Sequence, residues 1–273
     1  MRELVTAGRI FNHNYFVSHA GGKNIIEVFG RSRRCLESLN LNDIYGSDKV
    51  YLDCGANSGI ESISYLNDFG TIHSFEPDST NYICLRENLK HYSNCNNHKV
   101  ALSHENSTAT LVNYESGRVN HLDFLPTVRG RRVIGTSTVA TRTLDSYDFT
   151  NVSYIKIDVE GGEYDLLQGA KDILKNNNPL IKIEISNRHN EVVDLLLSMG
   201  YNILAFAMDS YVYPLNDAPV FFESTDYPNQ TFWKSRDFSL AEFKENHERE
   251  FTTRYTVIPP YNPNWGDFYF RKS

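Results

Sequence analysis

The chain has 273 residues, of which 40% are hydrophobic and 22% charged, as in a soluble globular protein with one extended α/β domain or two small domains. Lys and Arg number 27 against 34 Asp and Glu, and the net charge of −7 argues against a protein whose main task is to bind a nucleic-acid backbone. No apolar run approaches the ~18 residues of a membrane-spanning helix, and the first residues lack the apolar segment of a secretory signal. We therefore expect a cytoplasmic protein without a membrane span.

The first 48 residues are predicted to form a leader that packs on the main domain. Apolar and polar side chains alternate over residues 9–17, as in a strand, and two glycines at 21–22 predict a turn. A short strand is expected at 25–29, and an arginine-rich helix at 32–41.

A regular alternation of strands and helices begins at residue 49. The connections between these elements are short, which is typical of a parallel, doubly wound sheet. The first strand runs into a glycine turn, and Gly70 is predicted to end the first helix. In chain order, the expected elements are a strand at 50–55, a helix at 60–69, a strand at 71–77, a helix at 79–92 and a strand at 98–102.

Residues 103–150 interrupt this alternation. Two strands are expected at 109–114 and 137–142, on either side of a polar loop with an arginine-rich segment at 129–132. We interpret residues 103–150 as a β-rich insertion at the edge of the sheet.

The alternation resumes at residue 154. The expected elements are a strand at 154–161, a helix at 163–175, a strand at 180–185, a helix at 191–199 and an antiparallel hairpin of 201–207 with 211–215. Residues 218–273 are rich in aromatic residues and proline, with one helix-capping signal at 239–242. The predicted organisation is a leader at 1–48, a Rossmann-like α/β core at 49–217 with a mostly parallel sheet, and a C-terminal aromatic extension at 218–273.

The clearest local motif is Asp53-Cys54-Gly55-Ala56-Asn57-Ser58-Gly59, between a predicted strand and a predicted helix. Glycines let the backbone approach a ligand closely, and the start of a helix offers unpaired N–H groups. The spacing matches neither the dinucleotide motif G-x-G-x-x-G nor the P-loop. Glu76 ends the next strand, where an acid accepts hydrogen bonds from ribose hydroxyls in nucleoside-binding βαβ units. The motif therefore predicts a nucleoside ligand that needs no pyrophosphate.

The pattern D-x-G-x-N-x-G followed by F-E-P resembles class I S-adenosylmethionine-dependent methyltransferases. Lys156-Ile157-Asp158-Val159-Glu160-Gly161-Gly162-Glu163 resembles the signature of the FkbM-type family among them, and the likeness covers about residues 49–205. It implies S-adenosylmethionine as the cofactor and S-adenosylhomocysteine as its product. The implied contacts are Asp53, Gly55, Asn57 and Gly59 for the methionine part, Glu76 for the ribose, Ala101, Leu102 and Ser103 for the adenine side, and Asp158 beside the transferred methyl.

A second group of acids follows two later strands. Asp158 and Glu160 share one side of the strand pattern, and Glu184 ends a neighbouring strand. Ligands bind beyond the carboxyl ends of strands in open α/β sheets, so we expect these acids to border the same crevice as Glu76. A hydroxyl acceptor must lose a proton when it is methylated. We predict Asp158 as the orienting group or base, with Glu160 and Glu184 in support.

Several alternatives stay open at this site. His189 is a second candidate base, and Lys156 and Lys182 are expected to form internal ion pairs with the acids. Clustered acids could also hold a divalent cation, but no metal is predicted, because the family is not generally recognised by one. The four cysteines also lack the spacing of a zinc site.

The predicted function is O-methylation of a hydroxyl, with a sugar of a glycan or glycoconjugate as acceptor by family analogy. An RNA cap or nucleoside methyltransferase is a second reading, favoured by the arginine-rich loop and opposed by the net charge. A non-catalytic module that binds S-adenosylmethionine is a third, and an NAD-dependent dehydrogenase is the least favoured.

The aromatic residues of the extension could stack on sugars, pack on the core or form a homodimer interface; they are Phe221, Phe222, Trp233, Tyr255, Tyr261, Trp265 and Tyr269.

Overall fold

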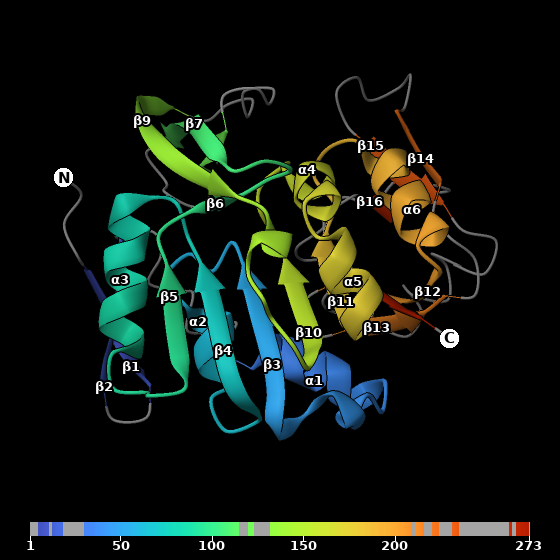
Figure 1. Cartoon of the computed structure of the whole chain (residues 1–273), viewed down its shortest axis with the longest axis horizontal. Helices are drawn as coiled ribbons and strands as arrows, with labels where there is room; N and C mark the ends of the chain where they lie inside the picture. The colour runs from blue at the N-terminus through green and yellow to red at the C-terminus, as the bar shows by residue number, and fades with distance from the viewer. Residues whose placement is uncertain are drawn as a thin grey trace.

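A computed structural model gives the fold of the chain (Figure 1). The structure describes residues 5–10, 13–18, 30–114, 120–122, 132–208, 211–215, 220–223, 231–234, 262–263 and 266–272. The predicted turn at 21–22, the predicted strand at 25–29 and the capping signal at 239–242 lie outside these residues.

The centre of the molecule is an eight-stranded sheet in the order β13-β12-β17-β11-β10-β3-β4-β5. The strands from β11 to β5 are mutually parallel, whereas β17 is antiparallel to both of its neighbours, and β13 forms the predicted hairpin with β12. Their bounds are β3 Gly46–Cys54, β4 Phe69–Phe75, β5 Cys95–His98, β10 Val152–Ile157, β11 Leu180–Glu184, β12 Tyr201–Met208, β13 Tyr211–Pro214 and β17 Asp267–Lys272. The predicted doubly wound, mostly parallel sheet is confirmed.

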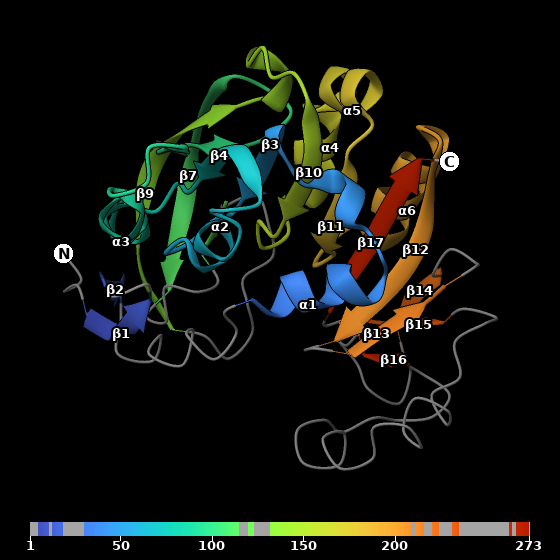
Figure 2. The same ribbon diagram turned by 90° about the horizontal axis from the view of Figure 1, so that it is seen from below.

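Helices cover both faces of this sheet (Figures 1 and 2). Apolar residues of α4, α5 and α6 pack on Ile155, Ile157 and Ile183, and residues of α1, α2 and α3 pack with Tyr51 and Tyr154 on the other side. Both faces are buried, as a parallel sheet requires. The bounds are α1 Arg31–Ser38, α2 Ile60–Ser64, α3 Ser79–Leu89, α4 Glu163–Gln168, α5 Lys171–Asn177 and α6 His189–Ser198. In the described part of the chain no helix is long and apolar enough to cross a membrane.

The predicted insertion forms a second sheet of its own, in the order β6-β9-β7-β8. Its long strands β7 and β9 are antiparallel, and β6 is parallel to β9. Figure 1 shows this insertion sheet above the arrowheads of β3, β4 and β5, which are the carboxyl ends of the parallel strands. The bounds are β6 Ala101–Leu102, β7 Ser107–Tyr114, β8 His121–Leu122 and β9 Val133–Arg142.

Several predicted elements have different limits in the structure; for example, the strand expected at 154–161 ends at Ile157. The strand expected at 98–102 is divided, because β5 belongs to the central sheet and β6 to the insertion sheet. The helix expected at 60–69 ends at Ser64, and Gly70 lies inside β4, where a Cβ would stand 1.8 Å from a backbone oxygen of the adjacent strand. The helix expected at 163–175 breaks into α4 and α5 at Gly169, whose missing side chain lets residue 103 approach.

The two ends of the chain add strands beyond the predicted core. β1 (Val5–Ile10) and β2 (His13–Val17) form an antiparallel hairpin. β17 was assigned to the extension at 218–273, but it lies in the middle of the central sheet, between β11 and β12. Three further strands form a small separate sheet: β14 Val220–Glu223, β15 Thr231–Lys234 and β16 Asn262–Pro263.

We expect Ile155→Ala to lower the free energy of unfolding by about 2–5 kcal/mol, because the side chain of Ile155 in β10 is fully buried under the helices that pack on this strand. Leu197→Ala on α6 is the control, since Leu197 is 39% exposed, and its effect should stay within about 0.5 kcal/mol. Urea unfolding of both variants measures the difference. Similar losses in the two variants would contradict the described core.

Candidate functional site

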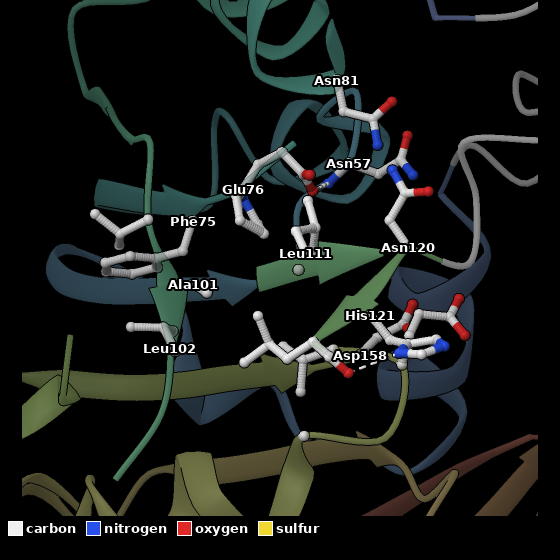
Figure 3. Close-up of a pocket in the computed structure, with 17 residues that line it drawn as sticks. Asn57, Phe75, Glu76, Asn81, Ala101, Leu102, Leu111, Asn120, His121 and Asp158 are labelled. Carbon is white, nitrogen blue, oxygen red and sulfur yellow. Dashed lines mark hydrogen bonds between the residues drawn. The ribbon is translucent and has the colours of Figure 1, made fainter. Parts of the chain in front are cut away.

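An open cavity lies between the carboxyl ends of β3, β4 and β10 and the insertion sheet (Figure 3), and its empty space of about 700 Å³ includes solvent at the mouth. The central sheet provides the turn after β3, the end of β4 and the segment after β10, and the insertion sheet provides the opposite wall. The lining residues are Gly55, Asn57, Phe75, Glu76, Pro77, Asn81, Val100, Ala101, Leu102, Leu111, Asn120, His121, Leu122, Asp158, Val159, Glu160 and Gly162. This is the edge of the sheet where the motifs predicted a ligand.

The glycine turn after β3 forms one side of the cavity. Gly55 has a φ of +81°, and a Cβ at this position would stand 1.8 Å from the backbone oxygen of Asp158. Gly55 is therefore required by the close approach of two protein segments. Gly59 also has a positive φ, but it does not line the cavity, and a Cβ there would meet Leu85 of α3 at 2.8 Å. Asn57 lines the cavity with a left-handed backbone.

Glu76 presents a buried carboxylate at the end of β4. Its Oε2 accepts a hydrogen bond from the backbone N–H of Asn57 at 2.9 Å, and its Oε1 accepts one from the backbone N–H of Asp78 at 2.9 Å. Burial raises the pKa of Glu76 to about 7, against the lowering effect of these hydrogen bonds. The side chain of Asn81 forms a third hydrogen bond with Glu76. A carboxylate has about four lone-pair sites, so Glu76 can still accept a hydrogen bond from a ligand hydroxyl.

An apolar surface adjoins Glu76. Phe75, Val100, Ala101 and Leu102 line this part of the cavity, and Leu111 of β7 is a further apolar lining residue (Figure 3). A flat aromatic base next to a ribose fits such a surface. Of the three residues predicted for the adenine side, Ala101 and Leu102 line the cavity, whereas Ser103 is buried and does not line it.

Asp158 and Glu160 line the cavity where the chain leaves β10. The backbone N–H of Asp158 donates to the carbonyl of Cys54 at 3.0 Å, which places Asp158 directly beside the glycine turn. Glu160 has a left-handed backbone, with a φ of +54°. The structure therefore brings both predicted acids to the cavity that Glu76 also lines.

Glu184 ends β11, one strand farther along the sheet. It is not a lining residue, and its neighbour across the strand pair is Asp267 of β17. Burial raises the pKa of Glu184 well above its usual range, and the nearby carboxylates of Asp158, Asp267 and Glu160 add to the effect. Glu184 thus stands beside the acids of the cavity without bordering the cavity itself.

Asp53 does not face the cavity. It is fully buried, and its Oδ2 accepts hydrogen bonds from the N–H and the Oγ of Ser62 in α2, at 3.1 and 2.5 Å. Its Oδ1 lies 3.5 Å from Nζ of Lys156. In this placement Asp53 anchors the start of α2 below the turn, and its contact with the methionine part stays a prediction.

The sequence motifs did not indicate the wall that faces the glycine turn. Asn81 lies in the first turn of α3, and Asn120 and His121 come from the insertion sheet. His121 is buried, its Nδ1 lies 2.7 Å from the carbonyl of Leu122, and its Nε2 lies 2.9 Å from the hydroxyl of Tyr114. Both ring nitrogens are thus engaged within the insertion sheet. No local pattern marks these residues, because only the folding of the insertion over the core brings them to the cavity.

The remaining candidate residues contribute less to the cavity. Burial lowers the pKa of His189 to about 4, and His189 is not a lining residue. Arg132 is exposed, while residues 129–131 lie outside the described chain. In the aromatic extension Tyr269 is fully buried in β17, whereas Tyr255, Tyr261 and Trp265 lie outside the described residues. Within the part of the chain that the structure describes, no group of three or more His, Cys, Asp or Glu side chains is arranged to hold a metal ion.

Gly55→Ala tests the close approach at the turn. Gly200→Ala is a matched control, because Gly200 has a similar φ of +83° but an added Cβ would have open space around it. The control should lose about 1–2 kcal/mol of unfolding free energy from backbone strain alone. Gly55→Ala should lose at least twice as much, measured by urea unfolding. Equal losses would mean that the turn and Asp158 are not in contact.

Comparison with known proteins identifies the family. The model of the methyltransferase FkbM domain matches residues 53–203, which is more than half of the chain. No curated protein matches the sequence. The match covers the glycine turn, Glu76, the insertion and both acid-bearing strands.

Solved structures of similar fold are distant. Methyltransferase FkbM from Methylobacillus flagellatus is 17% identical with a TM-score of 0.44, covering 68% of this chain and 56% of its own. An S-adenosylmethionine-dependent O-methyltransferase from Thermotoga maritima is 10% identical with a TM-score of 0.44, covering 99% and 77%. TYW2 of M. jannaschii, solved with S-adenosylmethionine, is 12% identical with a TM-score of 0.40, covering 73% and 74%. This chain thus spans little more than half the length of the Methylobacillus protein. On the family match, the chain belongs to the FkbM methyltransferase family.

Proposed function

We propose that this protein transfers the methyl group of S-adenosylmethionine to a hydroxyl of a sugar in a glycan or glycoconjugate. One observation carries the proposal: a single cavity joins a buried carboxylate suited to a ribose, Glu76, with two acids beside the glycine turn, Asp158 and Glu160. The sugar as acceptor rests on family analogy.

The lining residues fit the cofactor in three parts. The carboxylate of Glu76 accepts hydrogen bonds from the ribose hydroxyls, and the apolar surface of Phe75, Ala101 and Leu102 receives the adenine. Gly55 and Asn57 would hold the methionine part, and Asp158 would lie beside the sulfonium, because all three line the same side of the cavity. Asp53 and Gly59 lie behind this surface. Asp53 holds the start of α2 through Ser62, and Gly59 allows α3 to pack closely against the turn.

The chemistry needs an aligned hydroxyl and an acceptor for its proton. S-adenosylmethionine supplies an electrophilic methyl, so most of the protein's contribution is the in-line placement of the acceptor oxygen. As the O–CH₃ bond forms and the S–CH₃ bond breaks, the hydroxyl proton passes to the carboxylate of Asp158. Glu160 orients the acceptor, and Glu184 supports Asp158 from the neighbouring strand. Proton transfer of this kind contributes ~10²–10⁴-fold to a rate.

Acceptor recognition is assigned to the insertion sheet, because its residues Asn120 and His121 line the cavity opposite the glycine turn. The carboxylates at the cavity and the net charge of −7 disfavour a nucleic-acid acceptor. A cytoplasmic location and a homodimer formed through residues 218–273 stay predictions.

Binding of S-adenosylhomocysteine should weaken as the pH falls below about 7. The pKa of Glu76 is raised to about 7 in the free protein. Ribose O–H groups donate more strongly to the ionised carboxylate than to the protonated one. The affinity for S-adenosylhomocysteine is therefore present above pH 7, and it is lost as Glu76 becomes protonated below pH 7. Calorimetry between pH 5.5 and 8 should show a loss of up to about tenfold per pH unit. Glu76→Gln should bind more weakly at pH 8 and lose this slope, whereas an unchanged slope would remove Glu76 from the ribose site. NAD is the control ligand and should not bind.

Asp158→Asn should reduce methyl transfer at least about 100-fold while the affinity for S-adenosylhomocysteine stays within a few-fold, because the amide cannot accept the proton. Transfer of labelled methyl from S-adenosylmethionine to a panel of sugar acceptors is the measurement. Asp148→Asn, which changes an exposed acid away from the cavity, is the control. Unchanged turnover in Asp158→Asn would exclude Asp158 as the base.

A further inference from the structure

Lys156 carries a buried charge beneath the two segments that form the reactive side of the cavity. It lies in β10, is 5% exposed, and its Nζ donates to the carbonyl oxygen of Gly55 at 2.8 Å. The same Nζ lies 3.5 Å from Oδ1 of Asp53 and 3.4 Å from Oδ2 of Asp158. One ammonium group therefore touches the glycine turn, the acid below it and the acid proposed as the base.

The backbone contacts hold the two segments together but do not hold the side chain of Asp158. The N–H of Asp158 is bonded to Cys54, and the carbonyl of Asp158 lies against Gly55. Among the described residues, Lys156 is the cation within ion-pair distance of the Asp158 carboxylate. Without its ammonium, the buried carboxylate of Asp53 and the partly exposed carboxylate of Asp158, which now lie 3.5 and 3.4 Å from the same Nζ, would have no opposite charge between them.

We propose that Lys156 is a positioning residue of the methyltransferase site, which holds the glycine turn and the side chain of Asp158 in the arrangement that binds the cofactor. This inference rests on the proposed function. The ammonium acts by opposing the repulsion between Asp53 and Asp158, and by fixing the carbonyl of Gly55. Loss of the charge releases the side chain of Asp158 and the carbonyl of Gly55 from these positions, so cofactor affinity falls.

Lys182 provides a matched control within the same sheet. It stands beside Lys156 in the register of β10 and β11 and is also 5% exposed. Its Nζ lies 2.6 Å from Oγ of Ser32, 3.4 Å from Glu61 and 3.2 Å from Asp267. None of these three partners lines the cavity. Removal of either lysine charge breaks a buried ion-pair network, but of the two lysines only Lys156 directly contacts residues that line the cavity.

The experiment is calorimetric binding of S-adenosylhomocysteine to the full-length protein and to Lys156→Met, Lys182→Met and Lys156→Met/Asp53→Asn. All are measured at a temperature where circular dichroism shows them folded. Lys156→Met should bind at least tenfold more weakly than the wild type, and Lys182→Met within threefold of it. The double variant should recover most of the lost affinity, because Asp53→Asn removes the unneutralised charge that repels Asp158. A role in packing alone would give no such recovery.

Two results would overturn the inference: affinity of Lys156→Met within threefold of the wild type, or a double variant that binds no better than Lys156→Met. If either methionine variant does not fold, Lys156→Gln and Lys182→Gln are measured in place of the two methionine variants. The same difference in affinity is expected between them. Equal affinities of these two variants would also overturn the inference. Failure of the wild type to bind S-adenosylhomocysteine would instead count against the proposed function, so the two failures are distinguishable.

Discussion

The pairing of β3 with β10 is the contact on which the site depends. Its register sets Asp53 opposite Lys156 and Cys54 opposite Ile157, and it continues one step past the strands through the hydrogen bond from Asp158 to Cys54. The glycine turn and the acid-bearing segment consequently leave the sheet side by side. Their backbones approach so closely that position 55 has no room for a Cβ. The cavity is built on this contact.

The charges under the site are costly for stability. Lys156 and Lys182 are buried on a sheet face that otherwise packs tyrosines such as Tyr51 and Tyr154. Buried ion pairs seldom stabilise a protein more than well-packed apolar residues of the same size would. Their presence directly below the carboxyl ends of the strands is better explained by the arrangement of charges that the cavity needs than by the stability of the core.

The insertion sheet gives this fold its particular cavity. A parallel α/β sheet alone leaves the carboxyl ends of its strands open, and here the insertion covers them with a wall that includes Leu111, Asn120 and His121. The hydrogen bonds of His121 to Tyr114 and Leu122 stay within the insertion, so that wall is held by its own contacts. In the proposed function, the ends of β3, β4 and β10 together with β6 of the insertion sheet hold the cofactor, and Asn120 and His121 lie where an acceptor would bind.

The sequence by itself determined the alternating α/β core, the glycine turn, Glu76 and the acids after β10, because each is a short-range pattern of spacing and periodicity. It also placed the two strands of the insertion. Only the tertiary structure decided that β17 lies between β11 and β12, that Asp53 turns away from the cavity, and that Asn120 and His121 line it. These features depend on contacts between segments far apart in the chain, such as the single ammonium of Lys156 that both Asp53 and Asp158 share. No local pattern records which distant segments will meet, since that follows from how the whole sheet closes and buries its two faces.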